Sequence, residues 1–138
     1  MKKIDIINAV RVLSKLPINK VKNDKTKFAL LSDYRELRKV SKAIDEDRDV
    51  AVKKFREDFK DEIEVVASLR RHDLPVDAHE GYVTAERDLN KFLDNMLQEE
   101  IAVSIPAPVS WEDFVKAVGD TDLSFEEINS LDCIIAKS

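Results

Sequence analysis

The segment from Lys27 to Lys60 constrains the fold more than any other, because it contains neither glycine nor proline. The whole chain has only 2 Gly and 4 Pro among its 138 residues, and such a composition favours helices. One helix over the segment would be about 50 Å long, whereas a globule of this chain length has a radius of gyration of about 14 Å. We therefore expect an elongated molecule, a break near residues 45–47, or an overhang that meets a partner.

A heptad pattern predicts the apolar face of this segment. Its first core position holds Leu30, Leu37, Ile44 and Ala51, and its second holds Tyr34, Ser41, Arg48 and Phe55. Because Ser41 and Arg48 are polar, the pattern disfavours a continuous coiled coil. An antiparallel helical hairpin is the better interpretation.

A shorter helix is predicted before this segment. Apolar residues recur with helical spacing over residues 6–16, and Asp5 is a suitable N-cap because its carboxylate can accept the free amide hydrogens of the first turn. Pro17 ends this helix, since proline lacks the backbone donor. A short basic connector then leads to the long segment.

The middle of the chain is less clearly patterned. Residues 61–72 fit either an extension of the helix or a strand, and the following residues up to Gly81 have the character of a loop. Thr84 is expected to cap a helix over residues 85–98. Residues 101–105 alternate apolar and polar side chains, which predicts a short strand; its candidate partners are residues 63–66 and the N-terminal residues.

The C-terminal part has clear helix boundary signals. Ser110 followed by Asp113 resembles a capping box, and Gly119 suits the end of the helix that follows. Ser124 followed by Glu127 is a cleaner capping box for a final helix. Two helices this short must pack on each other or on the longer helices.

These patterns predict a mainly α fold, an elongated helical hairpin or bundle with a long central helix. A short C-terminal helical hairpin and a small two-stranded β element complete the expected architecture. We expect a single helical domain over residues 1–138, which residues 1–72 and 82–138 would subdivide into a long-helix part and a C-terminal helical part.

Charge is unevenly distributed along the chain. Residues 1–60 hold 17 Lys+Arg and 10 Asp+Glu, whereas residues 61–138 hold 6 and 18, so balances of +7 and −12 underlie the net charge of −5. The two halves could neutralise each other, join copies head to tail, or leave the basic half for an acidic partner such as nucleic acid. Acidic residues are interleaved with the basic ones, and the pI is about 5.1, which disfavours a nucleic-acid surface.

The residues that could carry catalysis or bind a cofactor are few. Two glycines cannot build a phosphate-binding loop, and a single cysteine, Cys133, cannot form an internal disulfide. His72 and His79 lie near three acidic residues, but their spacing matches no zinc motif. The acidic run over residues 45–49 would diverge around a helix instead of converging on one ion. We therefore expect no metal, cofactor, catalytic residue or small-molecule substrate.

Three aromatic residues, Trp111, Phe114 and Phe125, lie at the starts of the two C-terminal helices. They could form a small aromatic core, or they could be an exposed anchor for a partner. Since the surrounding sequence is acidic, an exposed Trp111 would favour a basic partner. The basic candidates for partner binding are Arg35, Arg38, Lys39 and Lys42.

The order of these features resembles a small family of uncharacterised proteins from temperate bacteriophages. The matching pieces are the Leu-Pro step near Leu13–Pro17, the charged helix through Tyr34 and Leu37, and residues 96–103 and 123–128. The resemblance covers most of the chain but not clearly residues 57–82, and the family has no established catalytic residues to transfer. It implies phage origin and a non-enzymatic role in the virion, in assembly or in contact with the host.

The expected function is therefore non-enzymatic: protein–protein interaction or structural assembly, with a protein partner or self-association. The alternative is a nucleic-acid-associated regulator that uses the basic N-terminal half. No apolar stretch approaches the roughly 20 residues needed to span a membrane, and residues 1–5 lack the features of a secretory signal. The expected location is the bacterial cytoplasm, or the virion if the protein is structural.

Overall fold

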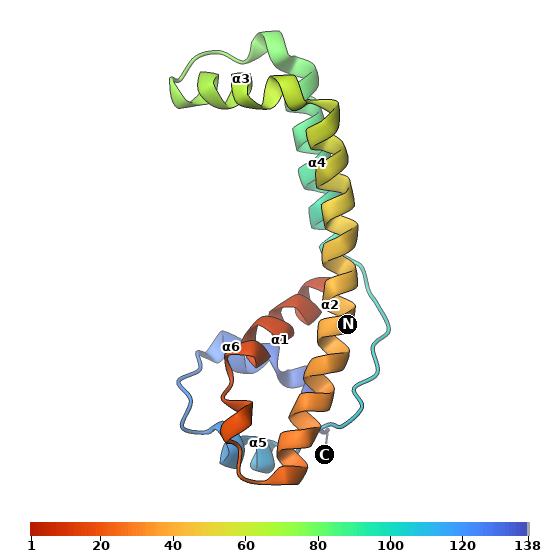
Figure 1. Ribbon diagram of the computed structural model, residues 1–138, viewed down its shortest axis with the longest axis vertical. Coiled ribbons are helices and arrows are strands. Elements are labelled where there is room, and N and C mark those ends of the chain that lie inside the picture. Colours follow the sequence, from red (N-terminus) through yellow and green to blue (C-terminus); the bar gives the residue numbers. More distant parts are fainter. Residues whose placement is uncertain (138) are drawn as a thin grey trace. The chain divides into compact units, whose positions relative to one another are not determined.

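A computed structural model describes residues 1–137, which form six α-helices and three short 3-10 helices (Figure 1). The α-helices are α1 (Lys3–Lys15), α2 (Asp24–Asp58), α3 (Lys60–Arg71), α4 (Glu80–Gln98), α5 (Trp111–Val118) and α6 (Phe125–Ser130). The 3-10 helices are η1 (Ile18–Lys20), η2 (Asp77–His79) and η3 (Asp132–Ile134). The predicted mainly α fold is confirmed, since 74% of the chain is helical.

The chain folds as two compact units. The first unit comprises Met1–Ala43 with Glu99–Ser138, and the second comprises Ile44–Gln98. These limits lie within α2 and at the end of α4, whereas the sequence suggested a subdivision between residues 72 and 82. Each unit is described by itself below.

Helix α2 is continuous through residues 45–47, so the alternative of a break there is wrong and the expected long central helix is confirmed. The acidic residues there are compatible with a solvated helix, and the segment contains no helix breaker. The helix begins earlier than expected because the side chain of Asn23 accepts a hydrogen bond from the backbone amide of Thr26 at 3.1 Å. Leu30, Leu37 and Ile44 are buried, which confirms one of the two heptad positions as a core position.

The N-terminal helix packs against the last one. Helix α1 buries Ile6, Ala9, Val12 and Leu13, and α6 lies against it (Figure 1). Its N-cap is Lys2 and not Asp5, because the backbone of the first residues is held by residues 99–101. The helix ends before Pro17, as predicted.

The expected strand over residues 101–105 is not formed. Among residues 1–137 the only antiparallel bridge joins Lys2 to Glu100, just before this segment. The amide of Ile101 donates to the carbonyl oxygen of Met1 at 2.7 Å, so the N-terminal residues are the partner, but the pairing does not extend into a ladder. Pro106 and Pro108 remove two backbone donors just beyond it. The other bridge among residues 1–137 joins Val109 to Ile135.

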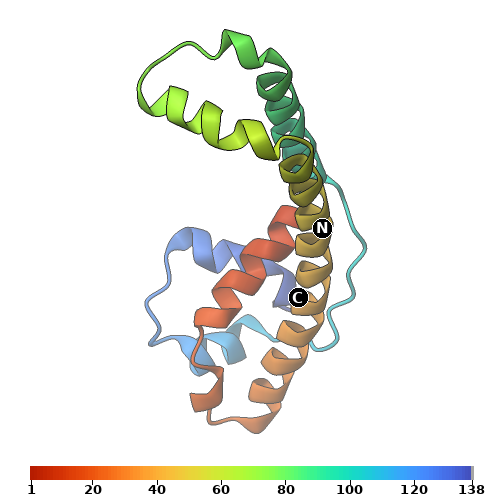
Figure 2. The same cartoon turned by 45° about the horizontal axis from the view of Figure 1, so that its top comes forward.

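In the second unit, α4 runs beside the C-terminal half of α2, as Figure 1 and Figure 2 both show. The ambiguous residues 61–72 belong to helix α3. Helix α4 starts at Glu80, so Thr84 lies inside it and is not its N-cap. The rings of Phe55, Phe59 and Tyr82 form a cluster, with centroids 5.2 to 5.6 Å apart.

The two units differ in how much apolar surface they bury. Among the described residues, 18 apolar side chains are buried, and 14 of them belong to the first unit. The other four are Ile44, Val66, Tyr82 and Met96. The first unit therefore contains most of the hydrophobic core.

Candidate partner-binding site on the C-terminal helices

Two caps position helix α5. The hydroxyl oxygen of Ser110 accepts a hydrogen bond from the amide of Asp113 at 3.1 Å. At the other end, the amide of Gly119 donates to the carbonyl oxygen of Val115 at 2.7 Å. Both predicted boundary residues are confirmed, and they place Trp111 at the first residue of the helix.

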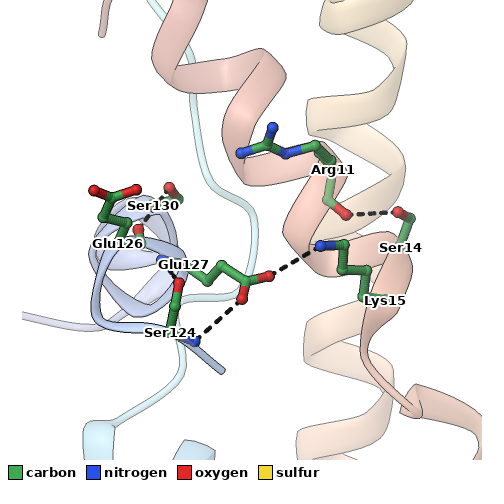
Figure 3. Close-up of polar contacts among 7 residues, drawn as sticks. All are labelled: Arg11, Ser14, Lys15, Ser124, Glu126, Glu127 and Ser130. Atoms are coloured by element: carbon green, nitrogen blue, oxygen red, sulfur yellow. Dashed lines mark hydrogen bonds and ion pairs between the residues drawn. The ribbon is translucent and has the colours of Figure 1, made fainter. Parts of the chain in front are cut away.

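Helix α6 begins with the predicted capping box. The amide of Glu127 donates to the hydroxyl oxygen of Ser124, and the amide of Ser124 donates to Oε1 of Glu127, both at 3.1 Å (Figure 3). Lys15 of α1 donates to the other carboxylate oxygen at 3.1 Å. The hydrogen bond from Ser124 and the pairing with Lys15 hold the pKa of Glu127 below its ordinary value. One carboxylate thus both caps α6 and joins it to α1.

The three predicted aromatic residues have different environments. Phe114 is buried, and its ring stacks on that of Trp111 with centroids 5.8 Å apart. Trp111 is 51% exposed and Phe125 is 83% exposed. The structure therefore places Phe114 in the core and the other two at the surface. The exposed indole of Trp111 packs on the buried ring of Phe114.

A small cavity of about 290 Å³ lies beside Trp111. Its apolar lining comprises Trp111, Phe114, Val115, Val118, Leu123 and Ile128. This volume is at the lower limit for small-molecule sites, so it suits one large side chain of a partner better than a cofactor. Val115 was not among the residues predicted from the sequence; its 44% exposure follows from its position four residues after Trp111 on the same helix face.

The surface around this cavity is acidic. Residues 110–130 contain six Asp+Glu and one Lys, and that lysine, Lys116, pairs with Glu112 at 3.1 Å. Within residues 1–137, no ion pair involves the remaining acidic residues of this surface, Asp113, Asp120, Asp122 and Glu126. The cavity thus has an apolar lining that includes one acidic residue, Asp122, and an acidic rim without ion pairs, of which Asp113 and Asp120 also line a second pocket together with Lys20 and Lys22.

The four basic candidates lie together on α2, within the first unit. Arg35, Arg38, Lys39 and Lys42 are all exposed, and their spacing places them on one helix face. The buried Leu30 and Leu37 occupy the opposite face. Phe28, seven residues before Arg35, is 62% exposed on the same basic face; a helical projection of the sequence would have found it.

Asp33 is a buried carboxyl group that the sequence did not single out. Its Oδ1 atom accepts a hydrogen bond from the amide of Ala107 at 2.9 Å, whereas Oδ2 has no partner among the described residues. Burial raises the pKa of Asp33 to about 6.

The residues considered for metal binding and thiol chemistry are not arranged as a site. His79 contacts Glu62 at 3.0 Å, whereas His72 is exposed, and residues 1–137 contain no group of three or more metal-ligating side chains. Burial raises the pKa of the Cys133 thiol, which opposes formation of the reactive thiolate. None of the described helices is both long and apolar enough to cross a membrane.

No family model matches the chain, and neither curated proteins nor solved structures give a significant match.

Proposed function

We propose that this protein is a non-enzymatic interaction protein that binds a protein partner through the surface formed by α5 and α6. The observation that carries the proposal is the exposed indole of Trp111 beside a cavity large enough for one side chain. Exposed tryptophans next to well-packed apolar pockets are the residues that contribute most to binding at protein interfaces. Capping at both ends of α5 keeps this surface preformed, which lowers the entropic cost of binding.

The chemistry of the surface defines the partner it would bind. The cavity accepts an apolar anchor, and the acidic rim attracts positive charge around that anchor. A complementary partner therefore presents an aliphatic or aromatic side chain flanked by lysine or arginine. Assembly or host contact in a phage context is consistent with this binding mode, and the bacterial cytoplasm or the virion is the proposed location.

The chain's single tryptophan allows a direct test. The full chain can be used to select binding peptides from a random display library. The selected peptides should carry an apolar residue flanked by basic ones, and their binding should shift the fluorescence of Trp111. Trp111→Ala should weaken binding at least about tenfold. Phe92→Ala, which removes an exposed ring in the second unit, should leave it unchanged. Peptides without this pattern, or equal binding to both variants, would contradict the proposal.

A second candidate function is binding of nucleic acid by the four cations on α2. The observation in its favour is that none of them forms an ion pair within the described part of the chain. Contacts from four cations to phosphates would give a logarithmic salt slope of at most about −3.6 for duplex DNA. Absence of binding to DNA and RNA at low salt would end this alternative.

A further inference from the structure

The first unit carries two surfaces of opposite charge. The basic face consists of Phe28, Arg35, Arg38, Lys39 and Lys42 on α2. The acidic face consists of Trp111, Val115, Asp120, Asp122 and Glu126 on α5, α6 and their connection. Each surface combines exposed apolar groups with exposed charges of one sign.

The two faces do not neutralise each other by direct contact within one chain. The ion pairs that join the basic half of the sequence to the acidic half in the described structure are Met1–Glu100, Lys3–Glu99 and Lys15–Glu127. All three involve residues outside both faces. The charges of the two faces therefore remain available for a contact between molecules.

We propose that the partner of the acidic face is the basic face of a second copy of this chain. Phe28 of one copy would enter the cavity beside Trp111 of the other, and the cations that follow on α2 would meet the acidic rim. This inference rests on the proposed function and names its partner. Among candidate partners, a second copy is the one for which the structure itself supplies an exposed apolar anchor followed on the same helix face by basic residues.

Two features of the faces support the match. From Phe28 to Lys42 the basic face extends over about 21 Å of straight helix, with the four cations all on the C-terminal side of the anchor. Phe28 is more exposed, at 62%, than the neighbouring apolar residues of α2 that face the core. The contact joins two different surfaces. In a two-fold dimer each copy would bind the other through both surfaces, whereas in a head-to-tail assembly each copy would bind two different neighbours.

Sedimentation velocity of the full chain tests the inference. We expect self-association at about 50 mM salt that weakens at about 500 mM, because salt screens charges at the interface. A variant with all four cations of the basic face reversed should be monomeric. Its substitutions are Arg35→Glu, Arg38→Glu, Lys39→Glu and Lys42→Glu. The control variant reverses four exposed cations of the second unit and should self-associate as the wild type does. Its substitutions are Lys53→Glu, Lys54→Glu, Arg56→Glu and Lys60→Glu.

Mixing two monomeric variants gives the sharpest result. A chain with Asp120→Lys, Asp122→Lys and Glu126→Lys should also be monomeric, but it keeps an intact basic face. The fourfold α2 variant described above keeps an intact acidic face. Mixed, the two should associate although neither does so alone, because the intact basic face of one matches the intact acidic face of the other. The two reversed faces are again opposite in charge and support the same association. Phe28→Ala in the first of these chains should weaken that complex at least about tenfold.

The outcomes separate this inference from the proposed function. A wild-type chain that stays monomeric at low salt, yet binds the selected basic peptides through Trp111, overturns self-association and leaves the proposed function in place. Self-association that persists in both charge variants overturns the assignment of the two faces. Circular dichroism of each variant confirms that it is folded; because all the reversed residues are exposed, we expect unchanged helicity.

Discussion

Asp33 of α2 and Ala107, 74 residues apart in sequence, are joined by a 2.9 Å hydrogen bond from the Ala107 amide to the Asp33 carboxyl group. The contact holds the extended segment after α4 against the long helix within the first unit. The second carboxyl oxygen is buried without a partner among the described residues. A negative charge there is poorly solvated, and for that reason the pKa of Asp33 is raised to about 6.

The stability of the first unit should therefore depend on the protonation of Asp33. Since its pKa is higher in the folded chain, the folded state binds the proton more tightly, and stability is lost as the pH rises from about 4 to about 6. The shift from 3.8 to about 6 corresponds to at most about 3 kcal/mol. Urea unfolding of wild type and Asp33→Asn across this pH range checks this. The variant should exceed wild type in free energy of unfolding by the largest amount above pH 6.

The difference between the two chains isolates this one group, because other carboxylates titrate in both. Asparagine keeps an oxygen that can accept from Ala107, so the hydrogen bond is retained. Below about pH 3 the gain should disappear, since Asp33 is then neutral in both the folded and the unfolded state. A variant whose advantage does not change with pH would contradict the assigned pKa.

The capping box of α6 should stabilise the first unit measurably. Ser124→Ala removes the acceptor for the amide of Glu127 and should lower the free energy of unfolding by about 1 kcal/mol. Glu127→Gln preserves an acceptor for the Ser124 amide and should cost less, although it removes the charge that pairs with Lys15. Ser104→Ala, an exposed serine in the extended segment, serves as the control and should have no effect in chemical denaturation.

The two glycines should respond in opposite directions to alanine. A Cβ at Gly119 would meet the carbonyl oxygen of Val115, whereas nothing lies within 4 Å of a Cβ at Gly81. Gly119→Ala should therefore destabilise α5 by about 1 kcal/mol or more, because the backbone must shift to make room for the methyl group. Gly81→Ala, inside the first turn of α4, should stabilise by about 0.5 kcal/mol through the entropy of the unfolded chain. Thermal unfolding of the two variants measures both effects. Melting-temperature shifts of the same sign would refute this contrast.

Tyr82 should be the main stabilising residue of the second unit. Its ring packs on Phe55 and Phe59, and its hydroxyl donates to Glu86 at 3.3 Å. Tyr82→Ala should cost about 3 kcal/mol, while Tyr82→Phe loses only the hydrogen bond and should cost under about 1 kcal/mol. Amide hydrogen exchange resolved along the chain should show the loss of protection in residues 44–98. Equal effects of the two substitutions would exclude a packing role for the ring.

Local signals in the sequence predicted the helices that have side-chain caps. Ser110, Gly119, Ser124 and Glu127 act as predicted because their hydrogen bonds involve residues only a few positions apart. Asp5 failed as a cap because a distant segment, residues 99–101, holds the N-terminal backbone and lets the helix start earlier. The error therefore arose from a tertiary contact that no local pattern contains.

The candidate site was partly predictable for the same reason. Helical spacing could place the four cations of α2 on one face, but it could not tell which of Trp111, Phe114 and Phe125 is buried. That depends on how α5 and α6 pack in the first unit. The buried carboxyl group of Asp33 was equally hidden, since its environment depends on a contact 74 residues away.

The uneven core has a consequence for how the chain loses its structure. Residues 44–98 contain four of the 18 buried apolar side chains among the described residues, so less hydrophobic free energy opposes their opening. Segments of this kind open sub-globally, below the free energy of complete unfolding. A single melting temperature would then average two events. Proteolytic cleavage would begin in α3 and the loop that follows it, and would leave the surfaces proposed for binding intact.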